Sequence, residues 1–433
     1  MIIERKLYLN RLISKKDNGF IKIITGLRRC GKSYLLFNLY KDWLISTGIK
    51  EDCIIELRLD EDTNIKYRNP IELGKYIREK VCDKQKHFYV FLDEIQKVAE
   101  IQNPYIADYE EKITFVDVLL GLRSESNIDL YVTGSNSKML SSEVVTEFKD
   151  RGTEIKVNPL CFNEFYNAFP GDKSHAWKEF VRYGGMPATL SMVSAEEKSI
   201  YLKNLFDKTY ITDVVERHKI NNDISYLEDI LNVTASSIGS LTNATRLSNT
   251  FKSVNGLSIK SSTITTYINY FIDAFIMKKS ERFDVKGKQY IGTQQKYYYS
   301  DIGLRNARLN FRQVEESHIM ENIIYNELEV RNFNVDIGVV KYNHTDNTGK
   351  KLRSQLEIDF VANRNDNTYY IQSALTVADP DKQIQETRSL NRISDSFKKI
   401  VVVRDDIIPS YDDKGIYYIG IEEFLLHYID TME

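Results

Sequence analysis

The residues with the clearest chemistry lie near the start of the chain. Residues 26–33 read Gly-Leu-Arg-Arg-Cys-Gly-Lys-Ser, which satisfies the spacing G-x-x-x-x-G-K-[ST] in full. A triphosphate needs a concave row of backbone N–H donors, and the two glycines let the loop fold tightly enough to supply it. We expect Lys32 to reach the β- and γ-phosphates and the hydroxyl of Ser33 to coordinate Mg²⁺. The motif therefore predicts a site for ATP with Mg²⁺, although no residue pattern here separates ATP from GTP.

The segments on both sides of this loop fit the motif. Residues 20–25 have the pattern of a short buried strand, and residues 33–40 carry apolar side chains at helical spacing. The helix matters because its N-terminus adds a positive dipole end to the phosphate site. We expect the nucleotide to be bound by a continuous run of residues, namely Gly26, Leu27, Arg28, Arg29, Cys30, Gly31, Lys32, Ser33 and Tyr34.

A second apolar segment, residues 88–92, runs directly into Asp93 and Glu94. A strand that ends in two carboxylates suits nucleotide hydrolysis. Asp93 would hold Mg²⁺ through water, beside the Ser33 ligand, and Glu94 would polarise the attacking water. The alternative is an ordinary solvated strand end, where Asp and Glu are common.

Two weaker candidates follow. The apolar residues 130–132 lead into a polar turn, in which we select Ser135 to sense the γ-phosphate or orient the water; a plain polar turn is the alternative. Arg151 stands just before the last strand expected in this region. It could face the nucleotide of a neighbouring subunit and stabilise the charge of the transition state, which would require a homo-oligomer; a surface arginine is the alternative.

These residues need a scaffold that brings strand ends together. Between residues 20 and 160, strands alternate with helices: we expect strands at 20–25, 53–59, 87–92, 129–133 and 154–157, and helices that include 71–82 and 115–123. The alternation predicts an α/β fold with an open, mostly parallel sheet and helices on both faces. In such sheets the ligand lies at the carboxyl ends of the strands.

Beyond this region the pattern changes twice. Apolar residues recur at helical spacing between about 166 and 235, which predicts a helical lid. Residues 236–290 read as two helices and a strand pair, the order of a winged helix, and hold eight basic and three acidic residues. This is a modest electrostatic footprint for DNA, but the second helix carries no arginine, and winged helices also dock proteins. DNA and a protein partner therefore both stay open.

The last segment, residues 291–433, resembles the core of restriction endonucleases. Strands are expected near 296–299, 355–361, 368–374, 399–403 and 416–419, with helices at 316–331 and 380–392. The resemblance implies a second metal site of Glu321, Asp359 and Gln372, which is doubtful because an amide binds a hard cation less strongly than a carboxylate. Ala374 stands where a catalytic lysine is expected, and the nearest lysines in sequence are Lys350, Lys351 and Lys382. We therefore expect a binding role rather than cleavage of DNA.

Taken together, the motifs resemble the AAA-family ATPases of bacteria and archaea in which a C-terminal domain of uncharacterised function follows the ATPase. The resemblance rests on the phosphate loop, on Leu-Asp-Glu-Ile-Gln-Lys at 92–97 and on Pro-Leu-x-Phe-x-Glu-Phe at 159–165, and continues through 183–187, 301–305, 321–322 and 357–360. It implies that Arg151 acts as a finger and that a Gly-Gly-x-Pro element, with Pro187, lies near the adenine. Cys30 departs from the smaller residue that is commoner in the loop, but donation there is by backbone.

The composition limits the classes of protein to which the chain can belong. The chain has 433 residues, a formal net charge of −3, and four cysteines without metal-site spacing, which argues against a basic nucleic-acid coat, a zinc site and a disulfide framework. No apolar run approaches the length of a membrane span, and we expect a cytoplasmic protein. We predict a multidomain ATPase with an ATPase domain at 1–165, a lid at 166–235, a winged helix at 236–290 and an endonuclease-like domain at 291–433.

Its nucleotide cycle would switch the downstream domains, which would contact nucleic acid or a protein partner. Two alternatives stay open. The first is a metal-dependent nuclease that is gated by ATP. The second is a docking protein that holds its nucleotide without hydrolysing it.

Overall fold

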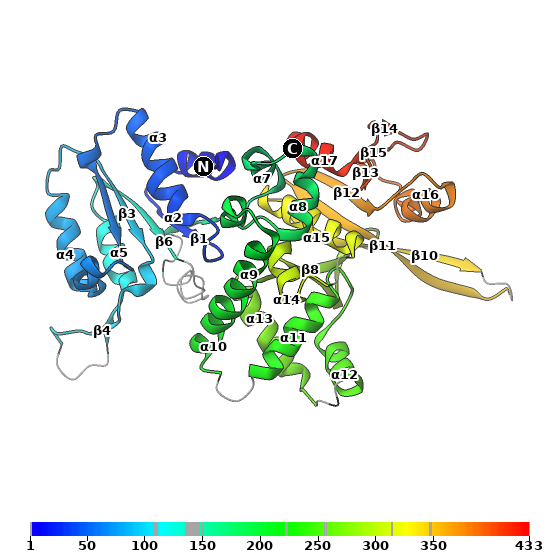
Figure 1. The fold of residues 1–433 in the computed structure, drawn as a ribbon, viewed down its shortest axis with the longest axis horizontal. Coiled ribbons are helices and arrows are strands. Elements are labelled where there is room, and N and C mark those ends of the chain that lie inside the picture. Colours follow the sequence, from blue (N-terminus) through cyan, green and yellow to red (C-terminus); the bar gives the residue numbers. More distant parts are fainter. Residues whose placement is uncertain are drawn as a thin grey trace. The chain divides into compact units, whose positions relative to one another are not determined.

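The computed structural model describes residues 2–106, 111–134, 148, 151–220, 224–254, 256, 258–312, 315–345 and 349–432. The chain forms two compact units. Unit 1 comprises Met1–Pro159 with Asp273–Phe275, and unit 2 comprises Leu160–Ile272 with Ile276–Glu433. Figure 1 draws both as ribbons, with the sheet of unit 1 in blue to cyan. The finer division into four domains stays a prediction.

The sheet of unit 1 has five parallel strands, which confirms the fold predicted for this region. In spatial order these are β2 (Ile54–Arg58), β3 (Phe88–Asp93), β6 (Ile128–Thr133), β1 (Ile21–Thr25) and β7 (Gly152–Lys156). β6 thus lies between β1 and β3. Because all five strands point the same way, the residues that follow β1, β3 and β6 meet at one edge of the sheet.

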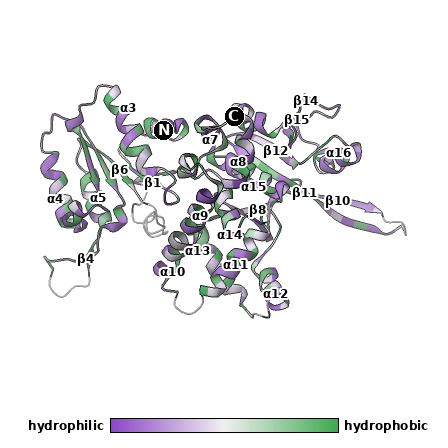
Figure 2. Ribbon diagram, viewed as in Figure 1, coloured by the Kyte–Doolittle hydropathy of each residue, from purple (hydrophilic) through white to green (hydrophobic). Residues whose placement is uncertain are grey.

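Helices cover both faces of this sheet. On one face Ile21 and Ile23 of β1 belong to a buried core with α4 (Pro70–Lys80) and α5 (Phe115–Arg123). Since strand side chains alternate, Lys22 and Ile24 lie on the other face. There Tyr40, in the helix that runs through α2 (Lys32–Tyr34), η1 (Leu35–Tyr40) and α3 (Lys41–Ser46), packs on Tyr131. Figure 2 shows the strands of this sheet largely in green, as expected for a doubly covered sheet.

The helix boundaries of unit 1 have local causes. At the start of α4 the Asn69 side chain accepts the backbone N–H of Ile71, and Pro70 takes the first helical position. At the start of α5, Thr114 and Asp117 form a reciprocal capping box. The N-terminal helix α1 covers Lys6–Ser14.

Unit 2 begins with helices, as the spacing after residue 166 predicts. Its longer helices are α7 (Phe162–Ala168), α8 (Ala176–Tyr183), α9 (Ala195–Leu205), α10 (Thr212–His218), α11 (Ile224–Ser236), α12 (Ala244–Val254), α13 (Ser261–Asp273), α14 (Ile302–Arg308), α15 (Glu316–Val330) and α16 (Pro380–Thr387). Among the described helices of the chain, none is both long and apolar enough to cross a membrane.

The second half of unit 2 is built on an eight-stranded mixed sheet. Its order is β14 (Ser410–Tyr411), β15 (Ile416–Gly420), β13 (Lys398–Val403), β12 (Asn367–Ala374), β11 (Lys351–Arg364), β10 (Asn334–Thr345), β8 (Met277–Asp284) and β9 (Gln289–Tyr299). β10 is a strand that the sequence pattern missed. β8 pairs with it in parallel, so the hairpin of β8 and β9 extends the sheet, and the domain boundary predicted at residue 290 falls inside β9.

Candidate functional site: a phosphate loop and two carboxylates

The loop after β1 has the backbone that its glycines predict. Gly26 has φ +133°, and a Cβ atom there would lie 2.0 Å from the carbonyl oxygen of Val157, which follows β7. Gly31 has φ +101° directly before α2, a conformation that L side chains rarely adopt. Both positions therefore require glycine. At Gly26 the reason is the close approach of Val157, and at Gly31 the reason is the positive φ angle.

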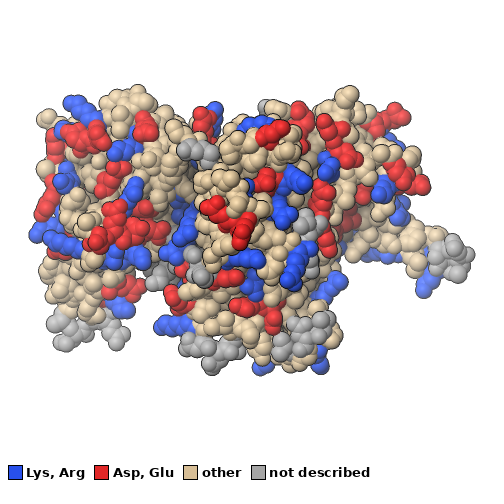
Figure 3. Space-filling model, viewed as in Figure 1, with Lys and Arg blue, Asp and Glu red and all other residues tan. Residues whose placement is uncertain are grey.

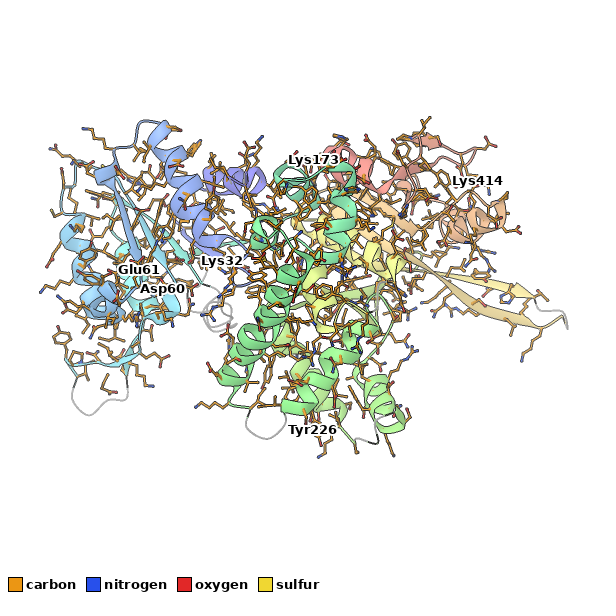
Figure 4. All side chains as sticks on the ribbon, in the orientation of Figure 1. Lys32, Asp60, Glu61, Lys173, Tyr226 and Lys414 are labelled. Atoms are coloured by element: carbon orange, nitrogen blue, oxygen red, sulfur yellow. The ribbon has the colours of Figure 1, made fainter. Side chains whose placement is uncertain are left out.

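Lys32 turns back over this loop. Its ammonium donates to the backbone carbonyl oxygens of Gly26 at 2.9 Å and of Leu27 at 2.8 Å, and the side chain is buried. Figure 4 shows Lys32 at the start of the helix that follows the loop. Its two acceptors are neutral, and hydrogen bonds between charged groups are stronger. A phosphate could therefore draw the ammonium away from these carbonyls.

The predicted magnesium ligands lie side by side. Ser33 Oγ donates to Asp93 Oδ1 at 3.0 Å, and the hydroxyl of Thr133 donates to the same oxygen. Thr133 ends β6, the strand between β1 and β3, so the sheet order itself places its hydroxyl between the loop and Asp93. A hydroxyl and a carboxylate are the hard oxygen donors that suit Mg²⁺. The pair fits the ion that the sequence predicts.

Glu94 is held in an unusual conformation directly after β3. It has φ +53°, a left-handed angle that is rare outside glycine, and its backbone N–H donates to Thr133 Oγ1 at 3.2 Å. The side-chain amide of Gln96 donates to its carboxylate. Such strained residues gather at functional sites, where their surroundings fix them. Thr133 thus contacts both residues of the carboxylate pair.

Arg5 is a site residue that the sequence pattern did not indicate. It precedes α1 and is buried, and its guanidinium donates to Cys30 O at 2.9 Å and to Asn158 O at 2.7 Å. It therefore ties the phosphate loop to the segment after β7. The Cys30 thiol strengthens the same link, since it is fully buried and donates to Val157 O at 3.3 Å. A single arginine before a helix has no sequence signature that could have revealed this contact.

The other predicted residues lie in different settings. Arg28 and Tyr34 are half-buried and Arg29 is exposed. Arg151 is exposed directly before β7, an edge strand, and its carbonyl accepts the Ile21 N–H. Ser135 lies outside the described residues.

Pro187 belongs to unit 2, where it begins the short helix η7 (Pro187–Ser191). Its contact with adenine and the finger role of Arg151 stay predictions.

The Gly-Gly element before Pro187 has a structural task inside unit 2. A Cβ atom on Gly185 would lie 2.1 Å from Leu160 O, and one on Gly303 would lie 1.9 Å from Tyr183 O. The two backbones are joined by Asp301, whose carboxylate accepts the N–H of Gly185 at 2.7 Å and that of Leu304 at 2.9 Å. Burial raises the pKa of Asp301 to about 6, against the opposing pull of these N–H groups.

The residues of the doubtful second metal site also meet in unit 2. The side-chain amide of Gln372 and the backbone N–H of Ser373 donate to Asp359 Oδ2 at 3.0 Å and 2.8 Å. Burial, together with the Glu321 carboxylate, raises the pKa of Asp359 to about 8. The lysine nearest to these carboxylates is not one of the three that the sequence suggested. It is Lys296 of β9, whose ammonium lies 2.8 Å from Glu321 Oε1.

Comparisons with known proteins agree with the first of these sites. Residues 18–166 match the model of an AAA domain, and residues 174–315 match a domain of unknown function. An uncharacterised protein of Haemophilus influenzae is 32% identical over 98% of this chain and 99% of its own length. An uncharacterised protein of Methanocaldococcus jannaschii is 28% identical over 93% of this chain and 85% of its own length.

Among solved structures, a Walker-type ATPase of Pyrococcus abyssi is similar to 71% of this chain over 96% of its own, with 14% identity and a TM-score of 0.45. The phosphate loop, the parallel sheet and the AAA model place residues 18–166 in the class of AAA-type P-loop ATPase domains. Within that class, the chain belongs to the family of the Haemophilus influenzae protein.

Proposed function

We propose that unit 1 binds ATP with Mg²⁺ and hydrolyses it to ADP and phosphate. The observation that carries the proposal is made at Asp93. One oxygen of its carboxylate accepts hydrogen bonds from the hydroxyl of Ser33, in the phosphate loop, and from the hydroxyl of Thr133, in the neighbouring strand. Mg²⁺ bound there would neutralise the charge that develops on the phosphates. Glu94, the next residue, would polarise the attacking water, and Lys32 would contact the β- and γ-phosphates.

Phosphate release from ATP tests this proposal. Purified protein should release phosphate in Mg²⁺, and Lys32→Ala should bind no nucleotide and release none. Lys414→Arg, an exposed position at the turn before β15, is the matched control and should behave as the parent. Equal turnover by Lys32→Ala and the parent would show that the activity comes from elsewhere.

A second function, contact with nucleic acid, is favoured by a basic arm in unit 2. We define the arm as the described residues 341–345 and 349–355, which are the distal parts of β10 and β11. They include Lys341, which is paired with Asp284 of β8, and Lys350, Lys351 and Arg353; no acidic residue occurs among them. Beyond Tyr342, arm residues from both strands are mostly exposed, so the arm has little core of its own. Figure 2 shows β10 in purple towards its far end, and Figure 3 shows lysine or arginine atoms on the arm.

The base of the arm adds aromatic and guanidinium groups. The Arg392 guanidinium lies 4.0 Å from the ring centroid of Tyr342, and Arg388 donates to the Tyr342 hydroxyl at 2.9 Å. Both arginines are exposed. An array of cations around an aromatic ring suits a phosphate backbone with unstacked bases nearby. We therefore propose that the nucleotide cycle switches a unit whose winged-helix-like and endonuclease-like parts, with this arm, bind nucleic acid.

Binding of fluorescent single- and double-stranded DNA tests the arm. Lys351→Glu with Arg353→Glu should weaken binding at low salt and flatten its salt dependence, by about one unit of log–log slope for each phosphate that the arm no longer neutralises. The control is Lys414→Glu, which makes the same kind of charge change in unit 2 away from the arm. If the control weakened DNA binding equally, the effect would come from the change in net charge and not from the arm. Absence of any DNA binding would instead favour a protein partner.

A further inference from the structure

The endonuclease-like part of unit 2 contains a cluster of carboxylates around a buried lysine, in which Glu321 and Asp359 are buried and Glu357 is half-buried. The Lys296 ammonium lies 2.8 Å from Glu321 Oε1, 2.7 Å from Glu357 Oε1 and 4.0 Å from Asp359 Oδ1. Glu321 comes from α15, the other two carboxylates come from β11, and Lys296 comes from β9. Lys296 is only 3% exposed, so its charge is compensated by this cluster rather than by water.

We propose that the Lys296 ammonium occupies the position that a divalent cation would take in this cluster, so that the site is closed to metal by the chain's own lysine. The inference goes beyond the proposed ATPase and explains how an endonuclease-like fold would bind nucleic acid without cutting it. It concerns only residues of unit 2 and does not depend on ATP hydrolysis.

One oxygen of each carboxylate in the cluster already contacts a protein donor. Glu321 Oε1 accepts the Tyr298 hydroxyl at 2.6 Å in addition to Lys296. Asp359 Oδ2 accepts two N–H groups, from Gln372 and from the Ser373 backbone. A magnesium ion requires near-octahedral oxygen coordination, so it would have to displace these donors.

The surroundings close the cluster on the side of α15. A Cβ atom on Gly239, in the connection between α11 and α12, would lie only 3.0 Å from Glu321 Oε2. The Gly239 N–H donates to the carbonyl of Tyr297, the residue after Lys296. Tyr298 stacks on Tyr325 of α15, with ring centroids 4.2 Å apart. These contacts fix β9 against α15 and therefore fix the position of the ammonium.

The charges explain why the lysine matters. One ammonium faces three carboxylates, and a buried carboxylate without a counter-charge is strongly unfavourable. If Lys296 is replaced by methionine, which keeps much of the side-chain volume, the cluster loses its only close ammonium among the described residues. A divalent cation would then compete with protons for the cluster, because burial and Glu321 already raise the pKa of Asp359 to about 8.

Binding of Mn²⁺ to the nucleotide-free full-length protein tests the proposal. The variants are the parent, Asp359→Asn, Lys296→Met, and Lys296→Met combined with Asp359→Asn; the number of bound Mn²⁺ is counted by electron paramagnetic resonance. We expect the parent and Asp359→Asn to bind the same number. Lys296→Met should gain one Mn²⁺ per chain, and the double variant should lose it again. The comparison with Asp359→Asn distinguishes Mn²⁺ bound in this cluster from any Mn²⁺ bound at Ser33 and Asp93.

Three results would overturn the proposal. The first is a lower Mn²⁺ count in Asp359→Asn than in the parent, because metal would then share the site with Lys296. The second is a folded Lys296→Met protein that gains no Mn²⁺. The third is nicking of supercoiled DNA by the parent that disappears in Asp359→Asn. If Lys296→Met does not fold, the first and third comparisons still decide.

Discussion

At the scale of single residues, the nucleotide site shows which contacts a sequence motif can predict and which it cannot. The sequence predicted Ser33 and Asp93 as neighbours, and their oxygens lie 3.0 Å apart. It did not predict Thr133, because nothing in a strand sequence shows that β6 will lie between β1 and β3. Arg5 and Lys296 were missed for the same reason. Each acts through contacts with segments far away in the chain, and only the fold creates those contacts.

The buried Asp301 gives a residue-scale prediction on pH. Its pKa is raised to about 6, whereas the unfolded chain releases the same proton near pH 3.8. Between these values the folded state binds more protons than the unfolded state, so the stability of unit 2 falls as the pH rises. A shift of about two units corresponds to about 3 kcal/mol. Denaturant unfolding at pH 4 to 7 should show a larger loss of stability in the parent than in Asp301→Asn, in which only other buried groups such as Asp359 still contribute. Parallel curves for the two proteins would contradict the prediction.

At the scale of elements, the five strands of unit 1 and helices α4 and α5 could be predicted from alternation and capping residues. In unit 2, β10 could not. Its apolar side chains lie in the half that joins the sheet, whereas Asn343, His344 and Thr345 are exposed in the arm. A strand with such a split environment has no constant period. The hairpin of β8 and β9, which the sequence pattern assigned to a winged helix, likewise reads as separate in sequence, yet β8 pairs with β10.

The packing of α8 against α14 gives a prediction at this scale. A Cβ atom on Gly303 would lie 1.9 Å from the Tyr183 carbonyl oxygen, so Gly303→Ala must push two backbones apart. Overpacking of this kind typically costs about 1–3 kcal/mol. Gly292→Ala is the control, since a Cβ atom there meets nothing within 4 Å and its φ is not in the left-handed region. In thermal unfolding, Gly303→Ala should melt at a lower temperature than Gly292→Ala. Equal melting temperatures would refute the close packing.

At the scale of the whole molecule, the open question is assembly. We predict that Arg151, exposed beside the edge strand β7, completes the active site of a second copy. Arg151→Ala and Glu94→Gln should then each be inactive alone, and mixing them should restore part of the turnover. A mixed oligomer contains interfaces in which both groups are intact. A fully active protein that stays monomeric at all concentrations in sedimentation experiments would rule this out.

We propose that Glu94 activates water at a nucleotide site formed by Ser33, Asp93 and Thr133. The most direct measurement is ATP binding and phosphate release by Glu94→Gln, compared with the parent in the same Mg²⁺ buffer. The substitution keeps the size of the side chain and removes the base. Binding should therefore be retained while the rate falls by about 10²–10⁴-fold. Hydrolysis at the parental rate would contradict the account.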